Sequence, residues 1–222
     1  MQEKRNRKNL ASCRLPLVAC NERLDFFEQD ALQKGFRCIA GVDEAGRGPL
    51  AGPVVAAAVI FQSLPLHLGI RDSKTLSPIQ RSAILLDIYR EAAAVGIGMI
   101  WMEEIETTNI HMASLKAMAD AVKRLNPIPE FILIDGNFPI DTSIPQLSII
   151  KGDSLSVSIA AASIVAKTMR DSIMDAYHNI FPCYNFTRNK GYGTAEHLEA
   201  IKHFGPCPIH RRGFKGVKEH IK

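Results

Sequence analysis

Apolar residues in this chain fall into two patterns, short continuous runs and longer stretches with helical spacing, and this mixture is typical of an α/β protein. The continuous runs predict strands around residues 38–40, 56–61, 96–102, 131–134 and 147–150. Helical spacing predicts helices around residues 24–34, 78–94, 110–125, 154–177 and 195–204. Most of these helices have recognisable ends. Ser77 with Gln80 forms a capping box, and Asn109 and Thr194 are further N-cap candidates.

The first two strands flank a connection rich in glycine and proline that carries Asp43 and Glu44. Adjacent residues of a regular strand point to opposite faces, so these two carboxylates are expected to converge only if the strand ends or bulges there. Arg47 follows between Gly46 and Gly48, and both glycines let the backbone approach a ligand. Hard carboxylate oxygens suit Mg²⁺ or Mn²⁺. A solvated acidic turn is the alternative interpretation.

Two further acids follow apolar strands. Asp135 ends the run at 131–134, at the kind of strand end where open α/β sheets bind ligands. Asp153 follows the run at 147–150 and opens the longest predicted helix. The alternatives are a turn-forming role for Asp135 and an N-cap role for Asp153. Two acids at strand ends nevertheless favour a shared site.

The longest predicted helix carries a polar line at helical spacing, formed by Ser156, Ser163, Lys167 and Arg170. Along this line, small hydroxyl groups are followed by two cations, and this order indicates a surface that an anion approaches.

Three other positions allow a functional or a structural interpretation. Lys74 precedes a helix N-terminus, where a phosphate is favoured, although a surface lysine is the simpler interpretation. Tyr192 lies between glycines, from where its ring could stack on a sugar or base. His210 is expected to be structural, because no second histidine lies at metal-ligand spacing in the sequence.

Composition indicates a globular protein with a substantial core, since 46% of the 222 residues are hydrophobic and 23% are charged. Net charge is +3 over residues 1–9, −4 over 10–150 and +5 over 151–222, so acid gathers near the expected metal site and base where a polyanion could lie. Five cysteines without a C-x-x-C pair favour a reducing compartment, and no apolar run is long enough to span a membrane. A lipoprotein-like signal at the N-terminus is interrupted by Arg14 and Pro16.

Seven motifs in order resemble bacterial type 2 ribonuclease H (ribonuclease HII). They are GVDEAGRGPLAGP at 41–53, DSK at 72–74, IDG at 134–136, KGD at 151–153, AASIVAK at 161–167, KGYGT at 190–194 and PIHRR at 208–212. The resemblance covers about residues 37 to 214 and leaves the basic residues 1–20 unexplained. It implies an α/β ribonuclease H-like fold, with a mixed central sheet flanked by helices and additional C-terminal helices. We therefore divide the chain into a basic extension with a short helix (1–36) and a catalytic domain (37–222).

The resemblance also implies an endoribonuclease that hydrolyses the RNA strand of RNA–DNA hybrids and cuts 5′ to ribonucleotides embedded in duplex DNA. Two Mg²⁺ or Mn²⁺ ions about 4 Å apart would activate water and stabilise the leaving 3′-oxygen, which gives 5′-phosphate and 3′-hydroxyl products. The implied catalytic and metal-binding residues are Asp43, Glu44, Asp135 and Asp153. The implied substrate-binding residues are Gly46, Arg47, Gly48, Lys74, Ser163, Lys167, Arg170 and Tyr192.

In this interpretation the partners are RNA–DNA hybrids or DNA duplexes with embedded ribonucleotides, and we expect a cytoplasmic monomer that acts in ribonucleotide excision and DNA replication. Two alternatives are a different metal-dependent enzyme on the same fold, such as a phosphotransferase or a DNA strand-transfer enzyme, and a non-catalytic hybrid-binding protein. The loops with Arg47 and Tyr192 disfavour the first, and the four carboxylates disfavour the second, because carboxylates repel a polyanion.

Overall fold

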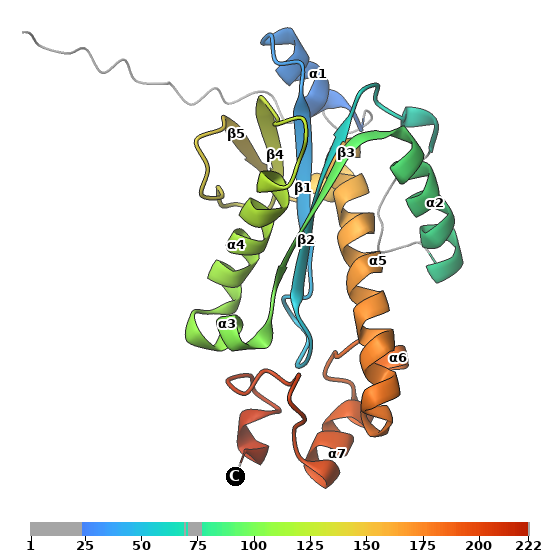
Figure 1. Cartoon of the computed structure of the whole chain (residues 1–222), viewed down its shortest axis with the longest axis vertical. Coiled ribbons are helices and arrows are strands. Elements are labelled where there is room, and N and C mark those ends of the chain that lie inside the picture. Colours follow the sequence, from blue (N-terminus) through green and yellow to red (C-terminus); the bar gives the residue numbers. More distant parts are fainter. Residues whose placement is uncertain (1–23, 69, 71–76, 222) are drawn as a thin grey trace, which may run out of the picture.

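A five-stranded sheet forms the centre of the molecule (Figure 1). The structure is a computed structural model that describes residues 24–68, 70 and 77–221. The strand order is β3-β2-β1-β4-β5, in which β3, β2 and β1 run antiparallel while β1, β4 and β5 run parallel. The strands are β1 (Ile39–Ala45), β2 (Val54–Phe61), β3 (Ala92–Ile100), β4 (Phe131–Asp135) and β5 (Gln146–Ile149). The sheet is therefore mixed, as the sequence resemblance implied.

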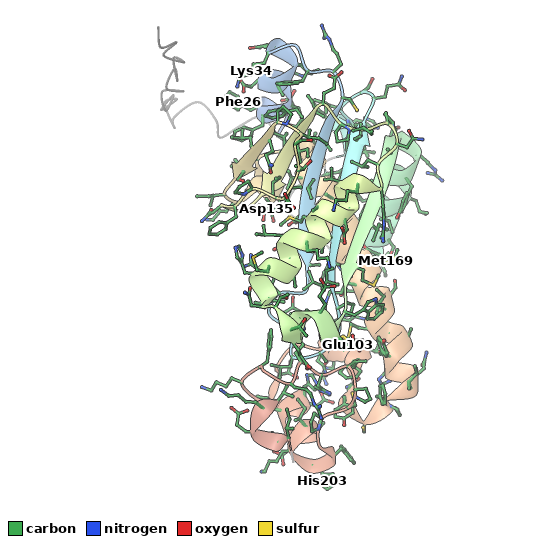
Figure 2. The ribbon with its side chains drawn as sticks, turned by 60° about the vertical axis from the view of Figure 1, so that its left-hand side comes forward. Phe26, Lys34, Glu103, Asp135, Met169 and His203 are labelled. Carbon is green, nitrogen blue, oxygen red and sulfur yellow. The ribbon has the colours of Figure 1, made fainter. Side chains whose placement is uncertain are left out.

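Helices cover both faces of the sheet and form a separate layer at one end (Figure 1). The α-helices are α1 (Phe26–Gln33), α2 (Pro78–Glu91), α3 (Met102–Thr107), α4 (Ile110–Lys123), α5 (Val157–Ile180), α6 (Phe186–Asn189) and α7 (Ala195–Phe204). Short 3-10 turns are η1 (Leu66–Leu68), η2 (Gly152–Ser154), η3 (Pro182–Tyr184) and η4 (Lys218–His220). The long helix α5, which carries Met169, runs from the sheet into the C-terminal layer that contains α6 and α7, and His203 lies on α7 (Figure 1 and Figure 2).

Strand β2 shows why the sheet is buried on both faces. All eight of its residues are buried, and alternate side chains enter different clusters. Ala56 and Ala58 pack in the cluster that contains α4, whereas Ala57 and Val59 pack in the cluster that contains α2 and α5. On the α5 face, Gly41 lets the helix lie directly on β1, because a Cβ atom there would be 2.1 Å from the backbone of Ser158.

Helix α1 is joined to the beginning of α5 by a buried carboxylate. Glu28 Oε1 accepts hydrogen bonds from Ser156 Oγ at 2.6 Å and from the Ser158 backbone N–H at 3.0 Å. A carboxylate is well suited to a helix N-terminus, where backbone N–H groups lack intrahelical partners. Ala31 of α1 also packs against Ile39 and Ile159. The domain boundary at residue 37 stays a prediction, although α1 shares a core with the sheet.

The sequence-based elements agree with the structure in kind and differ at their boundaries. The capping box of Ser77 and Gln80 is present, and Asn109 and Thr194 cap α4 and α7 as expected. The strand predicted over 96–102 instead starts at residue 92 and ends at residue 100. The predicted helix over 78–94 therefore ends earlier, and the short helix α3 was not predicted.

Ile79 and Leu86 fall at helical spacing in the sequence and predict an apolar face of α2, but both are exposed, at 84% and 59%. The helix instead packs on the sheet through Ile84, Leu85 and Ile88. Within the residues that the structure describes, no helix combines the length and apolar character needed to cross a bilayer.

Candidate active site

The acidic site lies where β1 extends past its neighbour β4. Parallel pairing between these strands ends at Val42 and Ile134, whereas β1 stays paired with β2 as far as Ala45. Asp43 and Glu44 therefore lie in the last three residues of β1, and the strand ends directly after them at Ala45, as their expected convergence required. The two side chains reach one cavity, because the edge of β1 next to them is not covered by β4.

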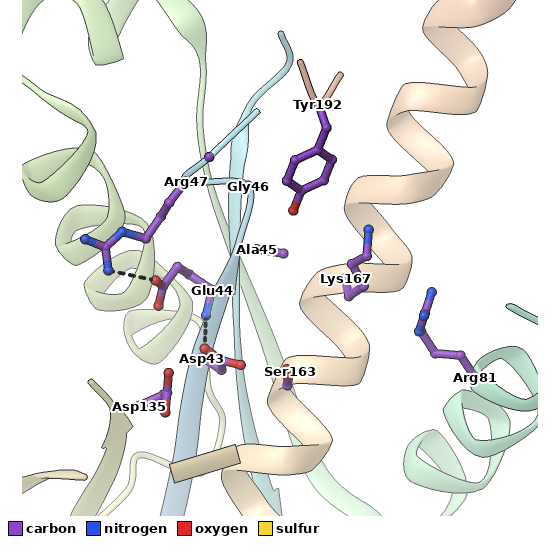
Figure 3. Close-up of a pocket in the computed structure, with 11 residues that line it drawn as sticks. Asp43, Glu44, Ala45, Gly46, Arg47, Arg81, Asp135, Ser163, Lys167 and Tyr192 are labelled. Atoms are coloured by element: carbon purple, nitrogen blue, oxygen red, sulfur yellow. Dashed lines mark hydrogen bonds and ion pairs between the residues drawn. The ribbon is translucent and has the colours of Figure 1, made fainter. Parts of the chain in front are cut away.

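This cavity has a volume of about 450 Å³ and brings acids and bases together (Figure 3). Its lining residues come from β1, the loop after β1, α2, the end of β4, α5 and the loop before α7; they are Asp43, Glu44, Ala45, Gly46, Arg47, Gly48, Arg81, Asp135, Ser163, Lys167 and Tyr192. Figure 3 shows the acids on one side and the cations of α2 and α5 on the other. Nine of the predicted site residues thus line one cavity.

Mutual repulsion and burial govern the protonation of the acids. Asp43 is only 5% exposed, and its Oδ1 accepts a hydrogen bond from the Glu44 backbone N–H at 2.7 Å. Burial raises the pKa of Asp43 well above its usual value, and the charges of Glu44 and Asp135 add to this effect. Burial also raises the pKa of Glu44, which Arg47 opposes through an ion pair of 3.4 Å.

The fourth predicted acid, Asp153, occupies a different position from the other three. It is buried in the turn η2 and is not among the residues that line the cavity. Its neighbour Gly152 donates a backbone hydrogen bond to Asp135 Oδ1 at 2.7 Å. The helix itself begins later than predicted, because Ser156 and not Asp153 caps α5. Asp153 therefore lies within the turn that supports Asp135.

The donor chemistry of the site fits a divalent cation. Carboxylate oxygens from β1 and β4 are hard ligands, and a bound cation would relieve the repulsion that raises the pKa of Asp43. Within residues 24–68, 70 and 77–221, no three His, Cys, Asp or Glu side chains already form a closed ligand group.

The loop after β1 is held from inside by the guanidinium group of Arg211. This side chain is fully buried and makes five hydrogen bonds, all to backbone carbonyl groups of the loop. The acceptors are Gly46 at 2.6 Å, Arg47 at 3.1 Å, Pro49 at 2.8 Å and Gly52 at 2.8 and 3.0 Å. Burial, with a smaller contribution from Arg170, lowers the pKa of Arg211 to about 9, so the group stays charged at neutral pH.

Arg170 holds the other half of the same loop. Its guanidinium is also buried and donates to the carbonyl groups of Ala51 (2.9 Å), Pro53 (3.1 Å) and Lys190 (2.9 Å). A Cβ on Gly46 would lie 2.4 Å from Arg170 Nε, and Gly46 has a φ of +104°, so both space and conformation require glycine. The position of Arg170 differs from the expected substrate-facing one, because it lies behind the loop.

These hydrogen bonds determine the direction of the loop amides. A trans peptide holds its C=O and N–H groups on opposite sides. Since the carbonyls of Gly46 and Arg47 point to Arg211, the N–H groups of Arg47 and Gly48 point away from it. The loop therefore presents backbone donors on the side opposite the buried arginine.

Tyr192 lies beside this loop, and its backbone carbonyl group takes part in a chain of buried hydrogen bonds. Its ring is 44% exposed, with Lys167 Nζ and Arg170 Cζ each 5.9 Å from the ring centroid. Its carbonyl oxygen is 2.8 Å from His197 Nδ1, and His197 Nε2 is 3.0 Å from His210 Nε2. His210 is buried and structural, as predicted, but its partner is a second histidine that sequence spacing did not suggest.

Sequence analysis did not predict a role for two residues of the site. Arg81 lines the cavity from the first turn of α2, and Arg211 supports the loop from the C-terminal segment. The sequence signal for Arg211 is its place in the PIHRR motif, whereas Arg81 follows the DSK motif at a helix start. Lys74 itself lies outside the described residues.

Solved structures define the class of protein. The ribonuclease H2 of Pyrococcus horikoshii OT3 matches with a TM-score of 0.70 and 23% identity, covering 82% of this chain and 96% of that chain. The ribonuclease HII in a complex with PCNA from Archaeoglobus fulgidus matches with a TM-score of 0.71 and 24% identity, covering 80% and 95%. A Bst ribonuclease HIII in complex with Mn²⁺ has a TM-score of 0.65 at 21% identity, covering 86% and 71%. This is the ribonuclease H fold.

Sequence comparison narrows the class to one family. The family model "Ribonuclease HII" matches residues 40–217. Ribonuclease HII of Syntrophus aciditrophicus is 56% identical, covering 86% of this chain and 91% of the relative, and that of Geotalea uraniireducens is 50% identical, covering 94% and 97%. The chain belongs to the ribonuclease HII family. It is a nuclease of the kind that cleaves RNA in RNA–DNA hybrids and at embedded ribonucleotides, and dependence on divalent metal is typical of the family.

The contacts of Arg211 generate a first prediction. Arg211→Lys keeps the charge but offers three donors in place of five, so loop carbonyls lose their partners. We expect kcat/KM on a substrate with one ribonucleotide to fall by at least about tenfold and the melting temperature to drop, since buried hydrogen bonds to charged groups contribute about 1.5–3 kcal/mol each. The matched control is Arg212→Lys, whose side chain is exposed. Equal activity of both variants would contradict the role of Arg211.

The electrostatics of Asp43 generate a second prediction. Its pKa is higher in the folded than in the unfolded protein, so at neutral pH the ionised group destabilises the metal-free fold. Asp43→Asn should therefore raise the free energy of unfolding in the presence of a chelator, by about 1.4 kcal/mol per unit of pKa difference. This advantage should shrink as pH falls through the raised pKa, because wild type then gains a proton.

Urea unfolding at about pH 7 and about pH 5 measures this effect. Asp141→Asn is the control, because Asp141 is an exposed acid. A loss of stability in Asp43→Asn at neutral pH would show that hydrogen bonding of this carboxylate outweighs its repulsion.

Proposed function

We propose that this protein cuts the phosphodiester bond on the 5′ side of a single ribonucleotide in duplex DNA, as well as bonds within longer RNA of a hybrid. The products would carry a 5′-phosphate and a 3′-hydroxyl. One observation carries the proposal: the acids of β1 and β4 share a single cavity with Arg47 and Tyr192. A carboxylate group for metal-assisted hydrolysis and a loop able to sense a sugar are thus adjacent.

Asp43, Glu44, Asp135 and Asp153 are the proposed metal ligands. Two Mg²⁺ or Mn²⁺ ions would supply Lewis-acid activation of water and stabilisation of the leaving oxygen. Support comes from the repulsion among Asp43, Glu44 and Asp135, which a cation would reverse. Asp153 would join them through a small shift of η2, since its neighbour Gly152 already contacts Asp135.

The loop of Gly46, Arg47 and Gly48 is the proposed sensor of the 2′-hydroxyl. A hydroxyl group distinguishes RNA from DNA as both donor and acceptor, and the loop offers backbone N–H groups that point away from Arg211. The ring of Tyr192 lies near Gly48, since a Cβ atom added to this glycine would be 3.7 Å from a ring carbon. Tyr192 would therefore stack on the sugar that follows the ribonucleotide.

The remaining predicted residues differ in how they would act. Ser163 and Lys167 line the cavity and would contact phosphate oxygens, which fixes register without sequence preference. Arg170 would act indirectly, by holding the loop, because its guanidinium is occupied by carbonyl groups. We expect a monomeric, cytoplasmic enzyme. A hybrid-binding protein without activity is disfavoured, since its relatives are ribonucleases and the acids remain in place.

The direct test uses end-labelled duplex DNA with one internal ribonucleotide, incubated with Mg²⁺ or Mn²⁺. We expect one cut on the 5′ side of the ribonucleotide. Asp135→Asn should reduce cleavage by at least about a thousandfold while binding of a hybrid stays within about threefold of wild type, because the acid serves metal binding and not substrate binding. A comparable loss of binding and cleavage would contradict the metal role of Asp135.

Tyr192 provides a test of junction sensing. Tyr192→Ala removes the stacking ring, which contributes about 1–3 kcal/mol per stacked base or sugar by analogy with single-strand binding. We expect kcat/KM to fall about tenfold or more at a single ribonucleotide and clearly less within a long RNA tract. Tyr192→Phe, which retains the ring, should stay close to wild type. Equal losses of Tyr192→Ala on both substrates would refute selective stacking.

A further inference from the structure

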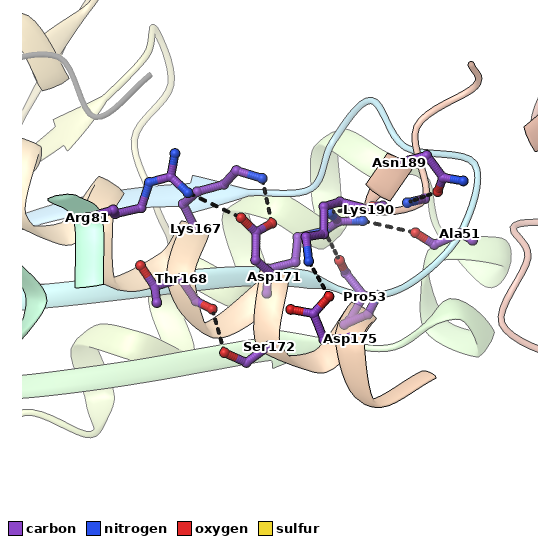
Figure 4. Close-up of polar contacts among 12 residues, drawn as sticks. Ala51, Pro53, Arg81, Lys167, Thr168, Asp171, Ser172, Asp175, Asn189 and Lys190 are labelled. Atoms are coloured by element: carbon purple, nitrogen blue, oxygen red, sulfur yellow. Dashed lines mark hydrogen bonds and ion pairs between the residues drawn. The ribbon is translucent and has the colours of Figure 1, made fainter. Parts of the chain in front are cut away.

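A cluster of three charged residues joins α2 to α5 beside the cavity (Figure 4). Asp171 Oδ1 is 2.5 Å from Lys167 Nζ, and Asp171 Oδ2 is 3.3 Å from Arg81 Nη1. The three side chains are only 12–28% exposed, so the ion pairs are partly screened from water. One carboxylate thus holds two cations, each through a different oxygen.

The two cations face the cavity, and the acid does not. Arg81 and Lys167 are among the residues that line the cavity, whereas Asp171 is absent from its lining. Figure 3 shows both cations on the side opposite Asp43, Glu44 and Asp135. The cavity therefore has one acidic wall for metal ions and one basic wall.

Two cations, Arg81 and Lys167, form the basic wall, and both are bound to Asp171. Holding two cations in a partly buried position is unfavourable on its own, since burial lowers the pKa of Lys167 in spite of its contact with Asp171. Both cations nevertheless line the cavity, where an anion that binds in front of them would offset this cost.

We propose that Arg81 is a substrate-binding residue that forms, together with Lys167, a site for a phosphodiester group of the nucleic acid near the bond that is cut. Asp171 is the positioning residue that fixes both cations from behind. Arg81 offers a planar donor fork and Lys167 a compact charge, a combination suited to a phosphate. This inference rests on the proposed function, because it assumes a nucleic-acid substrate in the cavity.

The first experiment compares Arg81→Gln with Arg90→Gln in the full chain. Arg90 lies on the same helix, is 74% exposed and pairs with Asp87, so it controls for loss of one positive charge from α2. We expect Arg81→Gln to raise KM about tenfold with kcat within about twofold of wild type, and Arg90→Gln to leave both unchanged. The slope of log KM against log salt should decrease by about 0.9, the value for one lost phosphate contact.

The kind of substrate provides a second readout. Both a single ribonucleotide and a long RNA tract present phosphates, so Arg81→Gln should raise KM equally on both. A purely structural role of Arg81 would instead lower the melting temperature and leave KM and its salt dependence unchanged, and that result would overturn the proposal.

Asp171→Asn tests the positioning role, because a charge effect and a positioning effect predict opposite changes in KM. Removing a negative charge near the cavity should strengthen binding of a polyanion if only charge matters. Loss of the tie should weaken binding if Asp171 positions the cations. We expect KM to rise about threefold or more despite the added net positive charge, and a fall in KM would overturn this part of the proposal.

Failure of the proposed phosphate site can be distinguished from failure of the proposed function. If wild type fails to cut duplex DNA with one ribonucleotide or an RNA–DNA hybrid, the proposed function is wrong. If wild type cuts normally and Arg81→Gln shows wild-type KM and salt dependence, the proposed function stands and the phosphate site is wrong.

Discussion

The buried guanidinium groups of Arg211 and Arg170 are the constraint on which the substrate-facing part of the molecule depends. Both donate their hydrogen bonds to backbone carbonyl groups, which belong to residues 46–53 and to Lys190. A buried charge is costly unless hydrogen-bonded, so the loop must keep its carbonyls turned inward. The N–H groups of Arg47 and Gly48 consequently point away from Arg211. The two buried arginines therefore control the direction of the backbone in this loop.

The rest of the cavity is arranged as an acidic side that faces a basic side. The acids of β1 and β4 repel one another, and burial of Asp43 intensifies that repulsion. Across the cavity, Arg81 and Lys167 share Asp171. In the proposed function, a substrate phosphate would be repelled by the first group and attracted by the second, so metal ions at the acidic wall would be needed to hold it there. The arrangement would couple substrate placement to metal binding.

Much of this architecture could be predicted from local sequence. Apolar runs that end in Asp43 and Asp135 indicated strand ends at a site, and Ser77 marked the start of α2. The features that sequence analysis placed incorrectly depend on tertiary structure. Arg170 has the spacing of an exposed polar line, but the loop covers it, and Asp153 resembles an N-cap although Ser156 takes that role. The position of Arg170 cannot be obtained from spacing alone, because it depends on a loop that is distant in the chain.

Arg211 lies far in the sequence from the carbonyl groups that accept its hydrogen bonds, and this separation affects how the site forms. Arg211 is separated from the carbonyl groups it binds by 159 to 165 residues. The strand β1 and its acids can form with β2 through local pairing, but the loop between these strands acquires its final direction only when the C-terminal segment packs against it. The acids on β1 and the loop that follows them therefore depend on contacts from different parts of the chain, since β1 pairs with the neighbouring strand β2 whereas Arg211 of the C-terminal segment fixes the loop.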